Sequence, residues 1–246
     1  MQTTKYLYEI CKNKKCGALA LIDPDTKNDL ILTDLIDNIN KSSFDAILVG
    51  GSLINDDNFD KRMKLIKSLT ELPVIIFPGS SKQISSDANA LLFLSLLSGR
   101  NPRYLIGEHV ESAPIIYSLN LETIPTGYIL LDGGSKTSVE IVSNTLPLPM
   151  DRVDIILAHA LAGQYLGNKF IFLECGSGSL NHVSTEIISK LSSKLSIPII
   201  VGGGIDNPQS AKLISDAGAD FIVVGTYIEN GASIKELSSI TDSLNV

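Results

Sequence analysis

Eight short apolar runs recur along the chain, and they end at Gly, Asp or Ser. They are GALALID (17–23), FDAILVGG (44–51), LPVIIFPG (72–79), ANALLFLSLL (88–97), TGYILLDGG (126–134), KFIFLECG (169–176), IPIIVGGG (197–204) and ADFIVVGT (219–226). Their continuous apolar character, in place of strict alternation, is typical of parallel strands covered on both faces. Most of the segments between them carry apolar residues at helical spacing, which predicts alternating strands and helices.

This alternation predicts an α/β fold, and the count of eight favours a (β/α)8 TIM-type barrel over an open doubly wound sheet. Only the short segment SSKQISSD (80–87) separates the third run from the fourth, so the crossover helix after the third strand is expected to be missing. A length of 246 residues, 44% of them hydrophobic, suits one such barrel. No linker or low-complexity segment interrupts the pattern, which predicts a single domain over residues 1–246.

The net charge of the chain limits the classes of molecule that it is expected to bind. A formal net charge of −7 argues against a nucleic-acid partner, because such surfaces need clustered Lys and Arg. An anionic substrate would therefore have to be held locally. The three cysteines form no CxxC pair, and no apolar run reaches the length of about 18 residues expected of a membrane span. These features predict a soluble, cytoplasmic protein.

Glycines gather at the ends of the last three runs. The sequences there are GSGS (176–179), VGGGI (201–205) and VVGT (223–226). Glycine lets backbone N–H groups approach an anion, and a following helix adds the positive end of its dipole. One such glycine usually means only a tight turn, but three consecutive strand ends together predict a phosphate-binding cup.

Two carboxylates, Asp23 and Glu174, directly end apolar runs. In a barrel of this class the active site lies at the carboxyl ends of the strands, so both are candidate site residues. The three histidines lack the spacing of a metal site or a catalytic triad, and the chain has no nucleophile elbow.

Six motifs follow one another along the chain, and their order and spacing are distinctive. They are LIDPD (21–25), VGGS (49–52), FPGS (77–80), LECGSGS (173–179), VGGGI (201–205) and VVGT (223–226). This set resembles the geranylgeranylglyceryl phosphate synthases and their heptaprenyl-transferring relatives, over about residues 16 to 230. The IDPD motif, with Leu21 where another branch has Lys, is similar to the branch of some archaea and Bacteroidetes-type bacteria. The resemblance implies a modified (β/α) barrel that moves a long prenyl group, geranylgeranyl, from its diphosphate to the C3 hydroxyl of sn-glycerol 1-phosphate. The products would be an ether-lipid precursor and diphosphate.

The same resemblance implies roles for single residues. Asp23 and Ser52 would bind Mg²⁺, and Glu174 would orient the attacking hydroxyl and take its proton. The glycerol phosphate would be bound by Phe172, Leu173, Glu174, Cys175, Gly176, Ser177, Gly178, Gly203, Gly204, Gly225 and Thr226. Many relatives have Tyr where this chain has Phe172. A homo-oligomer, and transient proximity of the lipid product to a membrane, are also implied.

Other functions are compatible with the motifs taken alone. Phosphate cups also serve barrels that isomerise or cyclise sugar phosphates or bind FMN. A non-catalytic barrel would be expected to keep the glycines and lose the acid or the metal position, yet Asp23, Ser52 and Glu174 are all present. The side chains that line a prenyl groove, among Phe77, Leu92, Phe93 and Tyr128, are not defined by the sequence.

Overall fold

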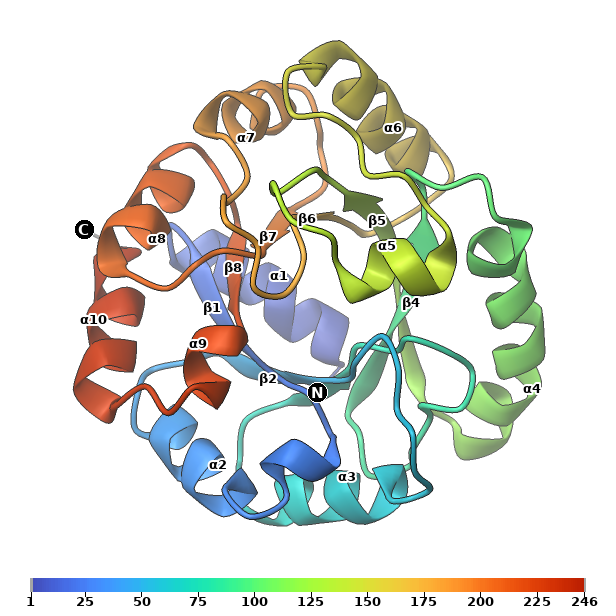
Figure 1. Ribbon diagram of the computed structural model, residues 1–246, viewed down its shortest axis with the longest axis vertical. Coiled ribbons are helices and arrows are strands. Elements are labelled where there is room, and N and C mark those ends of the chain that lie inside the picture. The colour runs from blue at the N-terminus through green and yellow to red at the C-terminus, as the bar shows by residue number, and fades with distance from the viewer. Residues whose placement is uncertain (1, 246) are drawn as a thin grey trace.

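The computed structural model describes residues 2–245, and its centre is a closed barrel of eight parallel strands (Figure 1). The strands are β1 (Gly17–Ile22), β2 (Ala46–Val49), β3 (Val74–Ile76), β4 (Ala90–Leu96), β5 (Glu122–Leu130), β6 (Phe170–Glu174), β7 (Ile199–Gly202) and β8 (Phe221–Val224). Each pairs with its neighbour in chain order, and β1 pairs with β8 to close the ring. The predicted barrel is confirmed, and each strand overlaps one of the eight apolar runs.

Helices surround the ring, and each of the seven long outer ones overlaps a segment with helical spacing. They are α2 (Leu32–Asn40), α3 (Phe59–Ser68), α4 (Glu108–Leu119), α6 (Val153–Tyr165), α7 (Thr185–Ser192), α8 (Pro208–Asp216) and α10 (Ile234–Ser243). Three begin at side-chain caps, on Ser184, Asn207 and Ser233, that satisfy N–H groups of the first turn. The short helices α5 (Ser138–Ser143) and α9 (Thr226–Glu229) had no clear sequence signal.

An additional helix, α1 (Thr3–Asn13), closes the amino end of the barrel, and Figure 1 shows it behind the ring. Its Leu7 and Ile10 are buried in the same cluster as the residues that fill the barrel interior. Glu122, at the start of β5, accepts hydrogen bonds from the backbone N–H groups of Thr3 and Thr4. Access to the barrel is therefore from the carboxyl ends of the strands.

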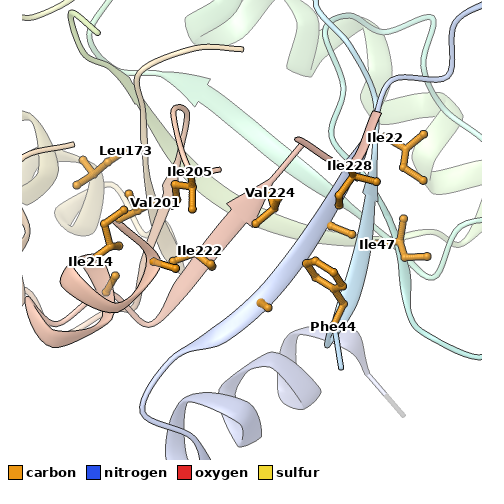
Figure 2. Packing of buried hydrophobic residues seen from close by; sticks show 14 of the residues in the cluster. Ile22, Phe44, Ile47, Leu173, Val201, Ile205, Ile214, Ile222, Val224 and Ile228 are labelled. Carbon is orange, nitrogen blue, oxygen red and sulfur yellow. The ribbon is translucent and has the colours of Figure 1, made fainter. Parts of the chain in front are cut away.

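The strands separate two apolar layers. On β6 the side chain of Phe170 fills the barrel interior, whereas that of Leu173 belongs to the layer between strands and helices. Figure 2 shows part of this outer layer, where Val201 of β7 and Ile222 of β8 lie beside Ile214 of α8. Because successive side chains of a strand point to opposite faces, the same alternation decides which residues at the strand ends point inward.

No helix lies between β3 and β4, as the sequence predicts. Figure 1 shows only loops on the outside of the ring between α3 and α4. In the middle of β4, Phe93, Leu94 and Ser95 are only partly buried. Within residues 2–245, no helix is both long and apolar enough to cross a membrane.

Candidate active site

A cleft of about 690 Å³ opens at the carboxyl ends of the strands. Its lining includes both predicted metal residues and most of the predicted phosphate cup. These residues are Asp23, Ser52, Glu174, Gly176, Ser177, Gly178, Gly203, Gly204, Gly225 and Thr226. The fold thus brings together, in one cavity, side chains and glycines that come from five different strand ends.

Three residues predicted to contact the substrate do not line this cleft. Phe172 is fully buried in the barrel interior, where its ring stacks on Phe77 at a centroid distance of 5.1 Å. Leu173 and Cys175 are fully buried in the outer layer, because they alternate with the inward positions Phe172 and Glu174. Their side chains therefore have no access to a ligand in the cleft, and only their main chain could contribute.

The glycine-rich ends form a concave surface of main-chain N–H groups. Gly203 and Gly204 have φ values of +88° and +69°, which L side chains rarely adopt. No hydrogen bond among residues 2–245 uses the N–H group of either residue, or that of Gly178. Ser177 Oγ lies 2.8 Å from Thr226 Oγ1, so the β6 loop meets the first turn of α9. Such a cradle of free amides and hydroxyls suits the oxygens of a phosphate.

Glu174 is a buried carboxylate at the inner edge of this surface. Its Oε1 accepts a hydrogen bond of 2.6 Å from the N–H of Gly176, so this amide is engaged by the acid. Burial raises the pKa of Glu174 to about 7, although the hydrogen bond from Gly176 lowers it. A carboxyl group with this pKa exchanges a proton near neutral pH, which is the property expected of a general base.

The glycines of β7 leave room for this carboxylate. A Cβ atom built at Gly202 would lie 2.5 Å from Glu174 Oε2, and one at Gly203 would lie 2.7 Å from Oε1. Both distances are shorter than any normal contact. The glycines of the motif VGGGI therefore leave open the space that the Glu174 carboxylate of the neighbouring strand occupies.

Asp23 ends β1 on the other side of the cleft. Its Oδ1 faces Gly51, where an added Cβ atom would lie 3.1 Å away. Within residues 2–245 this oxygen makes no hydrogen bond, whereas Oδ2 contacts Lys27. Burial and the charge of Glu229 raise the pKa of Asp23, while Lys27 lowers it. Ser52 follows Gly51 in the same turn.

These two oxygen donors fit Mg²⁺. Residues 2–245 contain no group of three or more His, Cys, Asp or Glu side chains that could hold a metal ion. A site with one free carboxylate oxygen and one hydroxyl suits Mg²⁺, which usually takes one or two protein ligands and completes its shell with substrate phosphates and water. The free Oδ1 of Asp23 beside the Gly51–Ser52 turn is the observation that supports this fit.

Two charged side chains that the sequence analysis did not identify, Lys27 and Glu229, lie next to Asp23. Glu229 of α9 accepts hydrogen bonds from the N–H of Asp23 at 2.7 Å and from Asn28 Nδ2 at 2.9 Å. The ammonium of Lys27 lies 3.2 Å from Asp23 Oδ2 and 3.0 Å from Glu229 Oε2. Lys27 and Glu229 are separated by 202 positions in the chain, so no local pattern could have paired them.

A buried arginine joins the loops that carry the two predicted metal ligands. Arg62, on α3, forms two-pronged hydrogen bonds with Asp29 in the β1 loop and Asp56 in the β2 loop. Its Nη1 also donates to the carbonyl oxygen of Pro24, next to Asp23. Fork-shaped guanidinium contacts of this type hold their partners in one orientation. Arg62 therefore fixes the β1 and β2 loops against one another.

Another part of the cleft wall is rich in apolar side chains. It is lined by Ile54, Phe77, Ile84, Leu91, Leu94, Leu96, Tyr104, Tyr128, Val139 and Val142, among others. Of the four side chains considered for a prenyl groove, Phe77 and Tyr128 line the cleft and Leu92 and Phe93 do not. Part of this wall belongs to β4, the strand that no helix covers after β3. Apolar side chains beside a surface of free main-chain N–H groups suit a ligand with an anionic group and a hydrocarbon tail.

The crowding at Gly202 can be tested by Gly202→Ala. The added methyl group would displace the Glu174 carboxylate, lowering the free energy of unfolding by about 1–3 kcal/mol and turnover by about tenfold or more. Urea unfolding and an activity assay measure the two effects. Gly107→Ala is a matched control, because the nearest atom to its added Cβ lies 3.7 Å away. Similar results for the two variants would contradict this account.

Comparison with known proteins agrees with the geometry. The family model described as the PcrB family matches residues 8–243. A geranylgeranylglyceryl phosphate synthase of Chitinophaga pinensis is 47% identical over 89% of this chain and 87% of its own length. The synthase of Methanosphaera stadtmanae is 37% identical, with both chains covered completely. The crystal structure of (S)-3-O-geranylgeranylglyceryl phosphate synthase from Thermoplasma acidophilum, in complex with sn-glycerol-1-phosphate, superposes with a TM-score of 0.93 at 34% identity, covering 100% of this chain and 99% of that one. The chain therefore belongs to the PcrB family.

Proposed function

We propose that this protein is a prenyltransferase that moves a geranylgeranyl group from its diphosphate to the C3 hydroxyl of sn-glycerol 1-phosphate. The observation that carries the proposal is one continuous cleft that joins a cradle of free amides, a buried carboxylate and an apolar wall. The names of the relatives, and the sn-glycerol-1-phosphate in the Thermoplasma structure, support the same substrate.

In this reaction the glycine-rich surface would hold the phosphate of the acceptor. The N–H groups of Gly178, Gly203 and Gly204 and the hydroxyls of Ser177 and Thr226 would donate to its oxygens. The C3 hydroxyl would then lie toward Glu174. Its ionised carboxylate would accept the hydroxyl proton as the oxygen bonds to C1 of the prenyl group, while the bond from C1 to the diphosphate oxygen breaks and its electron pair leaves with diphosphate.

The donor would occupy the other half of the cleft. Asp23 and Ser52 would bind Mg²⁺ and, through it, the diphosphate. When bound, the metal would neutralise part of the charge that develops on the leaving diphosphate. The apolar wall would bury the prenyl chain and exclude water from the reacting carbon.

The proposal is tested by incubating the purified protein with radiolabelled sn-glycerol 1-phosphate and prenyl diphosphates of several lengths. We expect label to move into a lipid-extractable ether in a Mg²⁺-dependent manner, with the highest turnover for geranylgeranyl diphosphate. A protein that releases no diphosphate with any donor, or one that retains FMN on purification, would contradict the proposed function.

The metal role of Asp23 is tested by Asp23→Asn. The amide keeps the size of the side chain but loses the charge that attracts Mg²⁺. We expect the Mg²⁺ concentration for half-maximal activity to rise about tenfold or more, while the KM for glycerol phosphate changes less than about twofold. Asp25→Asn removes a neighbouring charge from the same cleft and is the control. An unchanged Mg²⁺ requirement in Asp23→Asn would place the metal elsewhere.

The role of Glu174 as a base is tested by Glu174→Gln. Glutamine still accepts the hydrogen bond from Gly176 but takes no proton, so turnover should fall by about 10² or more. The affinity for glycerol phosphate should change much less, because the phosphate end is held by amides. In the unsubstituted protein, turnover should rise with pH up to about 7 and then level off, since the carboxylate must be ionised.

The same substitution should have a pH-dependent effect on stability. The pKa of Glu174 is about 7 in the folded protein, above the ordinary value of 4.5. Between pH 4.5 and about 7 the folded state therefore keeps a proton that the unfolded state has lost. Stability of the native protein should therefore fall as pH rises from about 4.5 to about 7. Glu174→Gln removes this loss and should be the more stable form at pH 8, by up to about 3 kcal/mol, but not at pH 4. Thermal unfolding at both pH values measures the difference, and a less stable variant at pH 8 would show that the acid supports the fold.

A further inference from the structure

Acidic side chains outnumber basic ones in the lining of the cleft, although both proposed substrates are anions. Lys27 is the only Lys or Arg side chain that lines it, within the part of the chain that the structure describes. The acidic side chains in the same lining are Asp23, Asp25, Glu108, Glu174 and Asp206. A prenyl diphosphate entering this cleft would thus meet one permanent positive charge, and that charge lies at the end of the cleft that holds Asp23.

Lys27 is held in place by two carboxylates that do not exhaust its hydrogen-bonding capacity. Its Nζ lies 3.2 Å from Asp23 Oδ2 and 3.0 Å from Glu229 Oε2. An ammonium group has three N–H donors, so one remains for a further acceptor. The side chain of Lys27 is 53% exposed, whereas that of Glu229 is 12% exposed. The ammonium is therefore held by Asp23 and Glu229 and remains exposed toward the cleft.

Glu229 is itself fixed from two other directions. Its Oε1 accepts hydrogen bonds from the backbone N–H of Asp23 and from Asn28 Nδ2, so the carboxylate has little freedom to turn. Glu229 also stands at the end of α9, whose first residue, Thr226, belongs to the phosphate cup. The position of the ammonium is thus tied both to the strand end that carries Asp23 and to the acceptor side of the cleft.

We propose that Lys27, whose ammonium Asp23 and Glu229 hold in place, is a diphosphate-binding residue of the active site. This inference rests on the proposed prenyl transfer. The third N–H of Lys27 would donate to a diphosphate oxygen of the donor, and its charge would stabilise the electron pair that leaves with diphosphate when the C1–O bond breaks. No proton transfer is required of Lys27, which stays an ammonium throughout.

The alternative is that Lys27 merely neutralises Asp23 and Glu229, and the two roles predict opposite effects on binding. Lys27→Ala removes a cation that competes for Asp23, so in either case Mg²⁺ alone should bind as tightly as before or more tightly. If the lysine is only a counter-ion, pyrophosphate that binds through Mg²⁺ should follow the same direction. If Lys27 contacts the diphosphate, pyrophosphate binding should weaken although the metal does not.

The test is calorimetric titration of the full chain with Mg²⁺, with inorganic pyrophosphate in excess Mg²⁺, and with sn-glycerol 1-phosphate. In Lys27→Ala and in Lys27→Gln we expect pyrophosphate to bind about tenfold more weakly or worse, with Mg²⁺ and glycerol phosphate affinities within about twofold of the unsubstituted protein or tighter. Lys27→Arg, which keeps the charge, should recover most of the affinity. Thermal unfolding of each variant confirms that it is folded under the assay conditions.

A matched control removes a positive charge that is exposed on the β3 loop but does not line the cleft, in Lys82→Ala. Equal weakening in Lys82→Ala would assign the effect to the general field of the protein and overturn the proposal. Unchanged or tighter pyrophosphate binding in both Lys27→Ala and Lys27→Gln would overturn it as well, with prenyl transfer left intact. Failure of the unsubstituted protein to bind pyrophosphate with Mg²⁺ would instead contradict the proposed function, and with it the role of Lys27.

Discussion

The alternation of side chains in a closed parallel barrel is the constraint on which the site depends. Once the ring closes, every second residue of a strand must fill the interior, and the next must pack under a helix. On β6 this places Phe172 inward and buried, Leu173 outward, and Glu174 inward at the open end of the barrel. A shift of one residue would exchange the acid with Cys175. The chemistry of the cleft is therefore a consequence of how the core is packed.

The placement of Glu174 at the open end of the barrel buries its carboxyl group and changes its pKa. A carboxylate removed from water is disfavoured in its charged form, which is why burial raises the pKa of Glu174 to about 7. Within residues 2–245 the carboxylate accepts one hydrogen bond, from the N–H of Gly176, and it occupies space that a side chain at Gly202 or Gly203 would fill. The result is a carboxyl group that exchanges a proton near neutral pH, as the proposed role of Glu174 as a base requires.

The opposite half of the cleft is organised by charged side chains that reach across loops. Arg62 ties the β1 loop to the β2 loop, and Glu229 ties the end of β1 to α9. Through the contact of Ser177 with Thr226, α9 also meets the β6 loop. No helix lies between β3 and β4, and Leu91, Leu94 and Leu96 of β4 line the same cleft as these loops. Polar and apolar parts of one elongated ligand can thus be held by neighbouring strand ends.

Much of this could be predicted from the sequence, because the relevant signals are local. Continuous apolar runs and helical spacing predicted the eight strands, the barrel and the missing helix. Acids and glycines at the ends of runs indicated residues that the structure brings into one cleft, among them Asp23, Glu174 and the glycine-rich strand ends. Alternation within β6 was the local signal that could have shown that the side chains of Phe172, Leu173 and Cys175 do not line the cleft.

Contacts between residues far apart in the chain had no such signal. The pairing of Lys27 with Glu229, the reach of Arg62 into two loops and the closure of the barrel by α1 were decided by the tertiary structure. The raised pKa of Glu174 belongs with them, since it comes from burial that only the assembled barrel creates. The sequence by itself determined which residue types stand at the strand ends, because that depends on neighbours along the chain. Only the folded ring decided which of them face one another, because that depends on register and closure across all eight strands.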